Sequence, residues 1–176
     1  MRKVILYIAM SLDGYIADSD GNIDWLGGEN PQCKGDYGYQ QFIDGVDTVI
    51  MGYNTYHQVT TELAPNAWPY AGMATYVMTR KQLTDQPDIT FTAESVATLL
   101  KHLKSGNGKN IWICGGANLV NQVMSAELID EYHLSIMPVM LGGGIRLFDA
   151  SHPQQALKLV QTADINGILD VIYRPR

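Results

Sequence analysis

The sequence predicts an α/β fold in which a mostly parallel sheet ends in an antiparallel hairpin. Several short apolar runs are continuous and bounded by turn residues, which is typical of strands covered on both faces. Segments with helical periodicity lie between these runs, as in chains that build parallel sheets. Near the C-terminus, Leu157–Ile165 and residues 168–173 flank Asn166-Gly167, a strong short-range signal for a hairpin turn.

The individual elements follow from the same patterns. Residues 4–10 predict the first buried strand, and residues 48–51, 75–79 and 111–114 predict three more. A helix is indicated by apolar residues spaced i, i+3, i+4 and i+7 on one face, which are Val96, Leu99, Leu100 and Leu103. The spacing recurs after Gly115-Gly116, so a second helix is expected there, with an apolar face of Leu119, Val120, Val123 and Met124.

Three segments complete the predicted order. Residues 132–137 predict a strand, and the glycine-rich residues 138–144 predict a loop. Residues 11–36 show no period and are rich in Gly, Asp and Asn. Because a long irregular segment inside a compact domain usually has a function, we expect one for this loop.

Composition limits the classes of protein that the chain can belong to. It has 176 residues, 12 Lys and Arg against 18 Asp and Glu, and a formal net charge of -6. This length suits one domain over residues 1–176, and the acidic balance argues against a nucleic-acid partner. The N-terminal apolar run is much shorter than the ~20 residues that cross a bilayer, and the two cysteines form no C-x-x-C motif. We therefore expect a cytoplasmic protein with no membrane partner.

Three predicted strands end in residues suited to binding an anion. Gly115 and Gly116 lead into a helix, whose first N–H groups and dipole attract phosphates. Gly52 and Thr55 follow a second strand, and Arg80 follows a third. Each also has a simpler explanation, namely a tight turn, a helix cap or a solvated surface charge. Because ligands of open α/β sheets bind at the carboxyl ends of strands, the three ends together favour a ligand site.

No metal site is expected. Residues 18–24 resemble the start of a calcium loop, but Ile23 stands where the sharp turn of such a loop needs glycine. A calcium-binding module is therefore kept only as an alternative. The four histidines show no metal-ligand spacing, and no Rossmann fingerprint, P-loop or zinc-protease motif occurs.

Short motifs run along essentially the whole chain. They begin with Ser11-Leu12-Asp13-Gly14-Tyr15-Ile16-Ala17, Asp20-Gly21 and Trp25-Leu26, and continue with Met51-Gly52-x-x-Thr55, Thr79-Arg80, Gly115-Gly116 and residues 138–144. In this set and order the chain resembles the dihydrofolate reductase-like family. It is most similar to the reductase domain of bacterial riboflavin biosynthesis.

The resemblance implies an eight-stranded, mostly parallel mixed sheet with flanking helices, and NADPH-dependent reduction of a heterocyclic small molecule. It assigns the adenosine side of NADPH to Thr55 and Arg80, and the pyrophosphate to Gly115, Gly116, Ala117, Asn118 and Leu119. Gly52, Tyr53 and Thr79 are also expected to bind the cofactor. It assigns the nicotinamide to Ala9, Ile16 and Trp25, with the loop of residues 11–36 folded over it. A homodimer is also expected from the family.

One position departs from the family pattern. The family usually has arginine after Met-Gly, whereas this chain has Tyr53. A phenol can stack on adenine but cannot form a two-pronged contact with a phosphate. A preference for NADPH over NADH therefore rests on Arg80, helped by Lys81.

Asp36 is the predicted proton donor, because it opens a helix-like stretch over residues 36–44 where dihydrofolate reductases carry their acidic residue. Burial beside the nicotinamide would raise the pKa of its carboxyl, as an acid at neutral pH requires. The alternative is an aspartate that only complements a helix dipole.

These observations together predict an NADPH-dependent reductase of a pyrimidine- or pteridine-like ring. The motif at residues 138–144 favours the riboflavin-pathway reaction on 5-amino-6-(5-phosphoribosylamino)uracil over dihydrofolate reduction. Lys34 and Arg146 are the cations expected near the site for a substrate phosphate. A protein that binds NADPH without catalysis is the alternative from another class.

Overall fold

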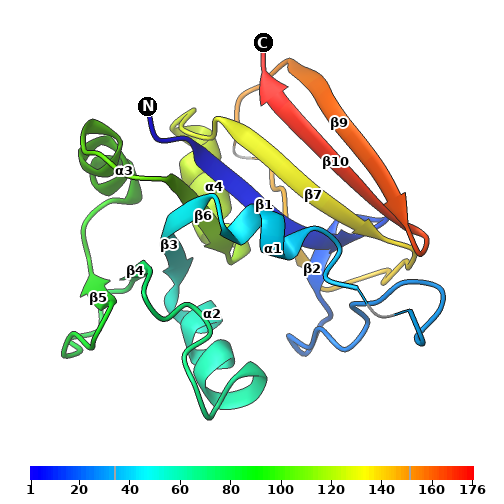
Figure 1. The fold of residues 1–176 in the computed structure, drawn as a ribbon, viewed down its shortest axis with the longest axis horizontal. Helices are drawn as coiled ribbons and strands as arrows, with labels where there is room; N and C mark the ends of the chain where they lie inside the picture. The colour runs from blue at the N-terminus through cyan, green and yellow to red at the C-terminus, as the bar shows by residue number, and fades with distance from the viewer. Residues whose placement is uncertain (34, 151) are drawn as a thin grey trace.

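The structure is a computed structural model that describes residues 1–33, 35–150 and 152–176. Its centre is an eight-stranded sheet with the order β5-β4-β3-β6-β1-β7-β10-β9 (Figure 1). The six strands from β5 to β7 pair in parallel, and β10 and β9 add an antiparallel hairpin. The predicted α/β fold, with its mostly parallel sheet and C-terminal hairpin, is confirmed.

Every strand and helix that the sequence predicted is present. The strands are β1 (Val4–Ser11), β3 (Val46–Gly52), β4 (Ala74–Met78), β6 (Asn110–Gly115), β7 (Glu131–Met137), β9 (Leu157–Ile165) and β10 (Ile168–Pro175). The two amphipathic helices are α3 (Val96–Ser105) and α4 (Ala117–Ser125). Ser95 caps α3 by accepting a hydrogen bond from the backbone N–H of Thr98.

Several short elements were not predicted. They are β5 (Ile89–Thr92), α2 (Tyr53–Gln58), the π-helical turn Val59–Leu63, and a separate two-stranded sheet of β2 (Tyr15–Ala17) and β8 (Ile145–Arg146). A further short helix, α1 (Tyr39–Ile43), occupies part of the helix-like stretch at residues 36–44. Elements of two to six residues carry too little periodicity to be recognised in a sequence.

Helices cover both faces of the sheet. Leu6, Leu100 and Val120 belong to the cluster under α3 and α4, and all three are fully buried. Met51, Val77 and Trp112 belong to a second cluster, against which the aromatic residues of α1 and α2 pack. Burial on both faces explains why the central strands appear in the sequence as unbroken apolar runs.

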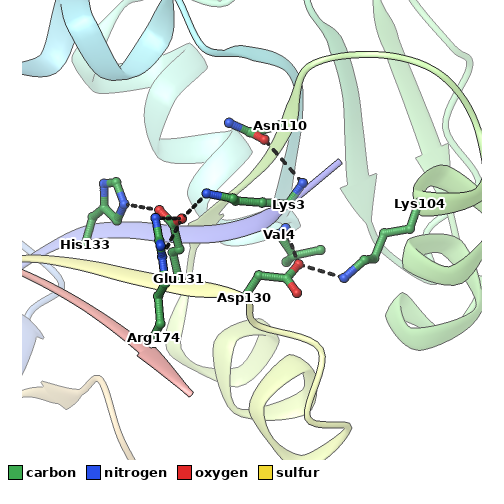
Figure 2. Close-up of polar contacts among 8 residues, drawn as sticks. All are labelled: Lys3, Val4, Lys104, Asn110, Asp130, Glu131, His133 and Arg174. Carbon is green, nitrogen blue, oxygen red and sulfur yellow. Dashed lines mark hydrogen bonds and ion pairs between the residues drawn. The ribbon is translucent and has the colours of Figure 1, made fainter. Parts of the chain in front are cut away.

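Ion pairs close the edge of the sheet where β1 and β7 begin (Figure 2). Glu131 is buried there and accepts hydrogen bonds from Lys3 Nζ, from His133 Nε2 at 2.9 Å, and from Arg174 Nε at 3.0 Å. Burial alone would raise the pKa of Glu131, but the hydrogen bonds from Lys3 and His133 and the charges of Lys3 and Arg174 hold it below its usual value. These charged residues bind one another where the strands begin, so we assign them a structural role. The carboxyl ends of the strands lie at the opposite end of the sheet.

No helix in the described part of the chain is long and apolar enough to span a bilayer.

Candidate functional site

The carboxyl ends of β3 and β6 bring two glycines and a threonine together. Gly52 ends β3 and Gly115 ends β6, and the two strands pair in parallel. A Cβ atom built on Gly52 would lie 3.8 Å from the backbone nitrogen of Gly116, and one built on Gly116 would lie 3.5 Å from Thr55 Oγ1. The peptide bond between Gly115 and Gly116 is cis. The strand ends singled out in the sequence thus meet, and backbone without side chains lines the point where they meet.

Helix α4 begins at this point without a side-chain cap. Gly116 is its N-cap residue, with φ −79 and ψ −170, and among the described residues no side-chain hydrogen bond caps the helix. The N–H groups of Ala117, Asn118 and Leu119 have no acceptor within the helix. The side chain of Leu119 is buried, so only its backbone can contribute to binding. Free N–H donors, a positive helix end and bare glycine backbone fit the pyrophosphate of a dinucleotide.

The residues expected on the adenosine side lie beside these strand ends. Tyr53 begins α2, and Lys81 Nζ lies 3.6 Å from the centroid of its ring. Thr79 follows β4 and accepts a 3.1 Å hydrogen bond from the backbone N–H of Lys81. Arg80 is exposed, and within the described residues nothing is bonded to its guanidinium. A cation therefore lies over Tyr53, at the position where the family usually has arginine.

The residues expected around the nicotinamide lie on three segments. Ala9 is on β1 and Ile16 is on β2, which contacts β1. Ile16 packs against the cluster under α3 and α4, whereas Ala9 alternates onto the opposite face of the sheet with Tyr7. Trp25 is half-buried in the long loop, and its Nε1 donates to the carbonyl of Asn22 at 3.2 Å. Ala9 and Ile16 can therefore border one ligand only where β1 ends.

Two of the sequence motifs bind each other. Asp13 accepts hydrogen bonds from the backbone N–H groups of Leu141 at 3.1 Å and Gly142 at 2.7 Å. The Ser11 hydroxyl, followed by these N–H groups, lowers the pKa of Asp13 to about 2. Gly144 has a φ of +129, and a Cβ there would lie 2.2 Å from the carbonyl oxygen of Ala17. The glycine-rich loop is thus held against the end of β1 and must carry glycine at residue 144.

The long loop is anchored to the turn between β9 and β10, which Figure 1 shows beside it. Asn166 Oδ1 accepts from the backbone N–H of Asn30 at 2.9 Å, and the Asn166 carbonyl accepts from that of Glu29 at 2.9 Å. Asn166 Nδ2 donates to Tyr37 at 3.1 Å. A Cβ on Gly28 would lie 2.2 Å from Asn166 Nδ2, so only glycine fits there. The loop therefore runs from β2 to the hairpin turn and on to α1.

Asp36 does not have the environment predicted for it. Its side chain is exposed, and its carboxylate accepts hydrogen bonds from the backbone N–H groups of Gln40 at 3.0 Å and Gly38 at 3.2 Å. The N–H groups of Gln40 and then Gly38 lower the pKa of Asp36. The expectation of a buried carboxyl with a raised pKa was wrong, because the helix-like stretch begins at the protein surface and uses Asp36 to satisfy its own first turn.

Of the two cations expected for a substrate phosphate, Arg146 lies among the described residues. Arg146 lies on β8, with its guanidinium carbon 4.7 Å from the centroid of the Tyr15 ring. Lys34 lies outside the described residues. Asp18, the first residue of the calcium-like segment, accepts from the backbone N–H groups of Asp20 and Asn22. Within the described ranges no group of three or more His, Cys, Asp or Glu is arranged to hold a metal.

Sequence reasoning missed a polar row beside Ala9. Ser135 on β7 pairs with Ala9 on one side and with Asp170 on the other, and the Ser135 hydroxyl donates to the Asp170 carboxylate. Tyr7 lies one step back on the same face of the sheet. The signal was the alternation of polar with apolar residues in residues 131–137 and 168–173, which indicates one face that is not packed in a core.

Comparisons with known sequences agree with these motifs. The family model described as the RibD C-terminal domain matches residues 2–169. The uncharacterized protein YwjB of Bacillus subtilis (strain 168) is 42% identical over 173 residues, covering 98% of this chain and 97% of that protein.

Solved structures share the fold. A protein of Shewanella sp. PV-4, named provisionally for riboflavin biosynthesis, superposes with a TM-score of 0.84 at 26% identity, covering 99% of both chains. A diaminohydroxyphosphoribosylaminopyrimidine deaminase/5-amino-6-(5-phosphoribosylamino)uracil reductase of Thermotoga maritima superposes with a TM-score of 0.73 at 18% identity. That match covers 99% of this chain and 57% of the Thermotoga protein.

Proposed function

Because the chain belongs to the family of the RibD C-terminal domain, the reductase family of riboflavin biosynthesis, we propose that it is an NADPH-dependent reductase of a pyrimidine- or pteridine-like ring. One observation carries the proposal. The bare ends of β3 and β6 meet at the uncapped N-terminus of α4, where Gly52, Gly116 and Thr55 lie together. This arrangement keeps side chains away from the start of α4 and supplies N–H donors for a phosphate.

The chain's own residues would then divide the work of binding along the ends of the strands. The first N–H groups of α4 would hold the pyrophosphate. Thr55 and Arg80 would bind the adenosine side, and Tyr53 with its overlying Lys81 would stack on the adenine. When bound, NADPH supplies a hydride. The loop anchored at Asn166 would exclude water, while Ala9, Ile16 and Trp25 would border the nicotinamide.

The substrate is proposed to be the riboflavin-pathway pyrimidine, with dihydrofolate as the alternative. The glycine-rich loop of residues 138–144 supports this choice, since it is the motif by which the chain resembles the riboflavin branch, and Asp13 holds it beside the end of β1. The printed name of the Thermotoga protein includes 5-amino-6-(5-phosphoribosylamino)uracil reductase.

A direct assay tests the reductase. Loss of NADPH absorbance is followed with the pure protein and each of the two substrates, and NADPH binding is measured separately by calorimetry. Turnover of either substrate supports the proposal. Binding of NADPH with no turnover of either would reduce the function to cofactor binding, and no binding would refute the proposal altogether.

We also propose that the protein forms a homodimer through the β9 edge. The outer edge of β9 has no paired strand among the described residues, and its side chains Leu159, Val160 and Ile165 are exposed. Such an edge invites pairing with a second copy.

A further inference from the structure

The sheet has a second face of interest, where β1, β7 and β10 carry residues that do not belong to the core under α3 and α4. Leu134 and Val171 point into that core, so Ser135 and Asp170 point the other way. Tyr7 lies on this outer face and stacks on Phe42 of α1 at 4.2 Å between ring centroids. The face is thus bounded on one side by aromatic rings, which suit a planar ligand.

Strand register sets the distances across this face. Ala9 pairs with Ser135, and Ser135 pairs with Asp170. Neighbouring strands are about 4.8 Å apart, so Ser135 lies about 5 Å and Asp170 about 10 Å from Ala9 along the row. All three are partly accessible. A ring held beside the nicotinamide expected at Ala9 would therefore reach both polar side chains.

The chemistry of this row is that of a hydrogen-bond acceptor. One oxygen of Asp170 accepts from the Ser135 hydroxyl, and no described residue is bonded to the other oxygen or forms an ion pair with the carboxylate. A carboxylate with a free oxygen beside a hydroxyl binds best to two neighbouring N–H donors, as a guanidinium or an aminopyrimidine edge provides.

The charges around the row are negative. Burial, and after it the negative charges of Asp170 and Asp36, raise the pKa of Tyr7 to about 12, against a hydrogen bond with Ser135 that lowers it. The nearest basic side chains on the same strands, His133 and Arg174, are both bonded to Glu131. A phosphate carried by the substrate is therefore expected to lie away from the Asp170 carboxylate.

We propose that Asp170 and Ser135 bind the reducible ring through an edge with adjacent N–H donors. This inference rests on the proposed reductase function for its location beside the nicotinamide. It narrows the substrate class to rings that present neighbouring N–H donors, as an aminopyrimidine does.

Binding measurements test the proposal without relying on turnover. The dissociation constant of 2,4-diaminopyrimidine is measured by calorimetry, with and without NADPH, for wild type, Asp170→Asn and Ser135→Ala. We expect binding to weaken about tenfold or more in Asp170→Asn, because a hydrogen bond to a charged carboxylate is lost. Binding should weaken severalfold in Ser135→Ala, because the carboxylate then lacks the hydroxyl that orients it. Asp164→Asn, an exposed carboxylate on β9, is the matched control and should bind as wild type does.

Two outcomes would overturn the proposal. They are no binding of 2,4-diaminopyrimidine, and equal binding of 2,4-diaminopyrimidine by wild type and Asp170→Asn. NADPH affinity, measured alone, should be unchanged in Asp170→Asn, so that a failure of the cofactor site and a failure of the ring site give different results.

Discussion

The substitution Gly116→Ala should weaken NADPH binding and leave the free energy of unfolding nearly unchanged. In the free protein the new Cβ would lie 3.5 Å from Thr55 Oγ1, which is ordinary van der Waals contact. The backbone at Gly116, with φ −79 and ψ −170, is accessible to alanine. Alanine is a poorer N-cap than glycine by about 0.5–1 kcal/mol, and the lower entropy of its unfolded chain offsets about 0.4–1 kcal/mol of this. The free energy of unfolding should therefore change by less than about 1 kcal/mol.

The effect on NADPH should be much larger. The methyl group would occupy the bare backbone surface in front of α4, so the pyrophosphate could no longer reach the first N–H groups. Losing one hydrogen bond to a charged phosphate costs about 1.5–3 kcal/mol, which corresponds to a dissociation constant raised about 10-fold to about 150-fold.

Calorimetric titration with NADPH and thermal unfolding are measured on the same preparations. Gly106→Ala is the matched control, because Gly106 ends α3 with φ −86 and a Cβ there would lie 3.6 Å from the Leu103 carbonyl oxygen. It should leave NADPH binding unchanged. If Gly116→Ala bound NADPH as tightly as wild type, the pyrophosphate would not lie at the start of α4.

Three further predictions follow from the same structure. Arg80→Ala should raise the dissociation constant of NADPH about tenfold more than that of NADH; equal effects in calorimetry would remove Arg80 from the 2′-phosphate. Glu131→Gln should lower the free energy of unfolding at pH 7 by about 2 kcal/mol, since it leaves Lys3 and Arg174 without their buried partner. Val160→Glu should shift the protein from dimer to monomer in light scattering, and a monomeric wild type would contradict the β9 interface.

The Glu131 prediction also has a pH dependence. The pKa of Glu131 is lower in the folded than in the unfolded protein, so its stabilisation is present above the unfolded value of about 4.5 and is lost as the pH falls through the folded value. The melting temperature of the wild type should fall over this acid range, and that of Glu131→Gln should fall less. Glu94→Gln, at an exposed site, should follow the wild-type curve.

Much of the fold could be predicted because its signals are local. The run at residues 4–10 is apolar on both faces because both faces of β1 are covered, and Asn166-Gly167 determines a turn with two residues. The strand-end glycines could be recognised for the same reason. Strand β5 could not be recognised, since Ile89 is buried and the other three residues of Ile89–Thr92 are half-buried, which gives no period.

The sequence by itself determined the class of sheet, the hairpin, the family and the residues at the ends of the strands. Only the tertiary structure decided that Asp36 is exposed and that Ser135 and Asp170, 35 residues apart in the chain, share a hydrogen bond beside Ala9. The physical reason is the distance along the chain over which each signal acts. Periodicity and turn chemistry act between near neighbours, whereas burial, charge environment and register depend on which distant strands pair.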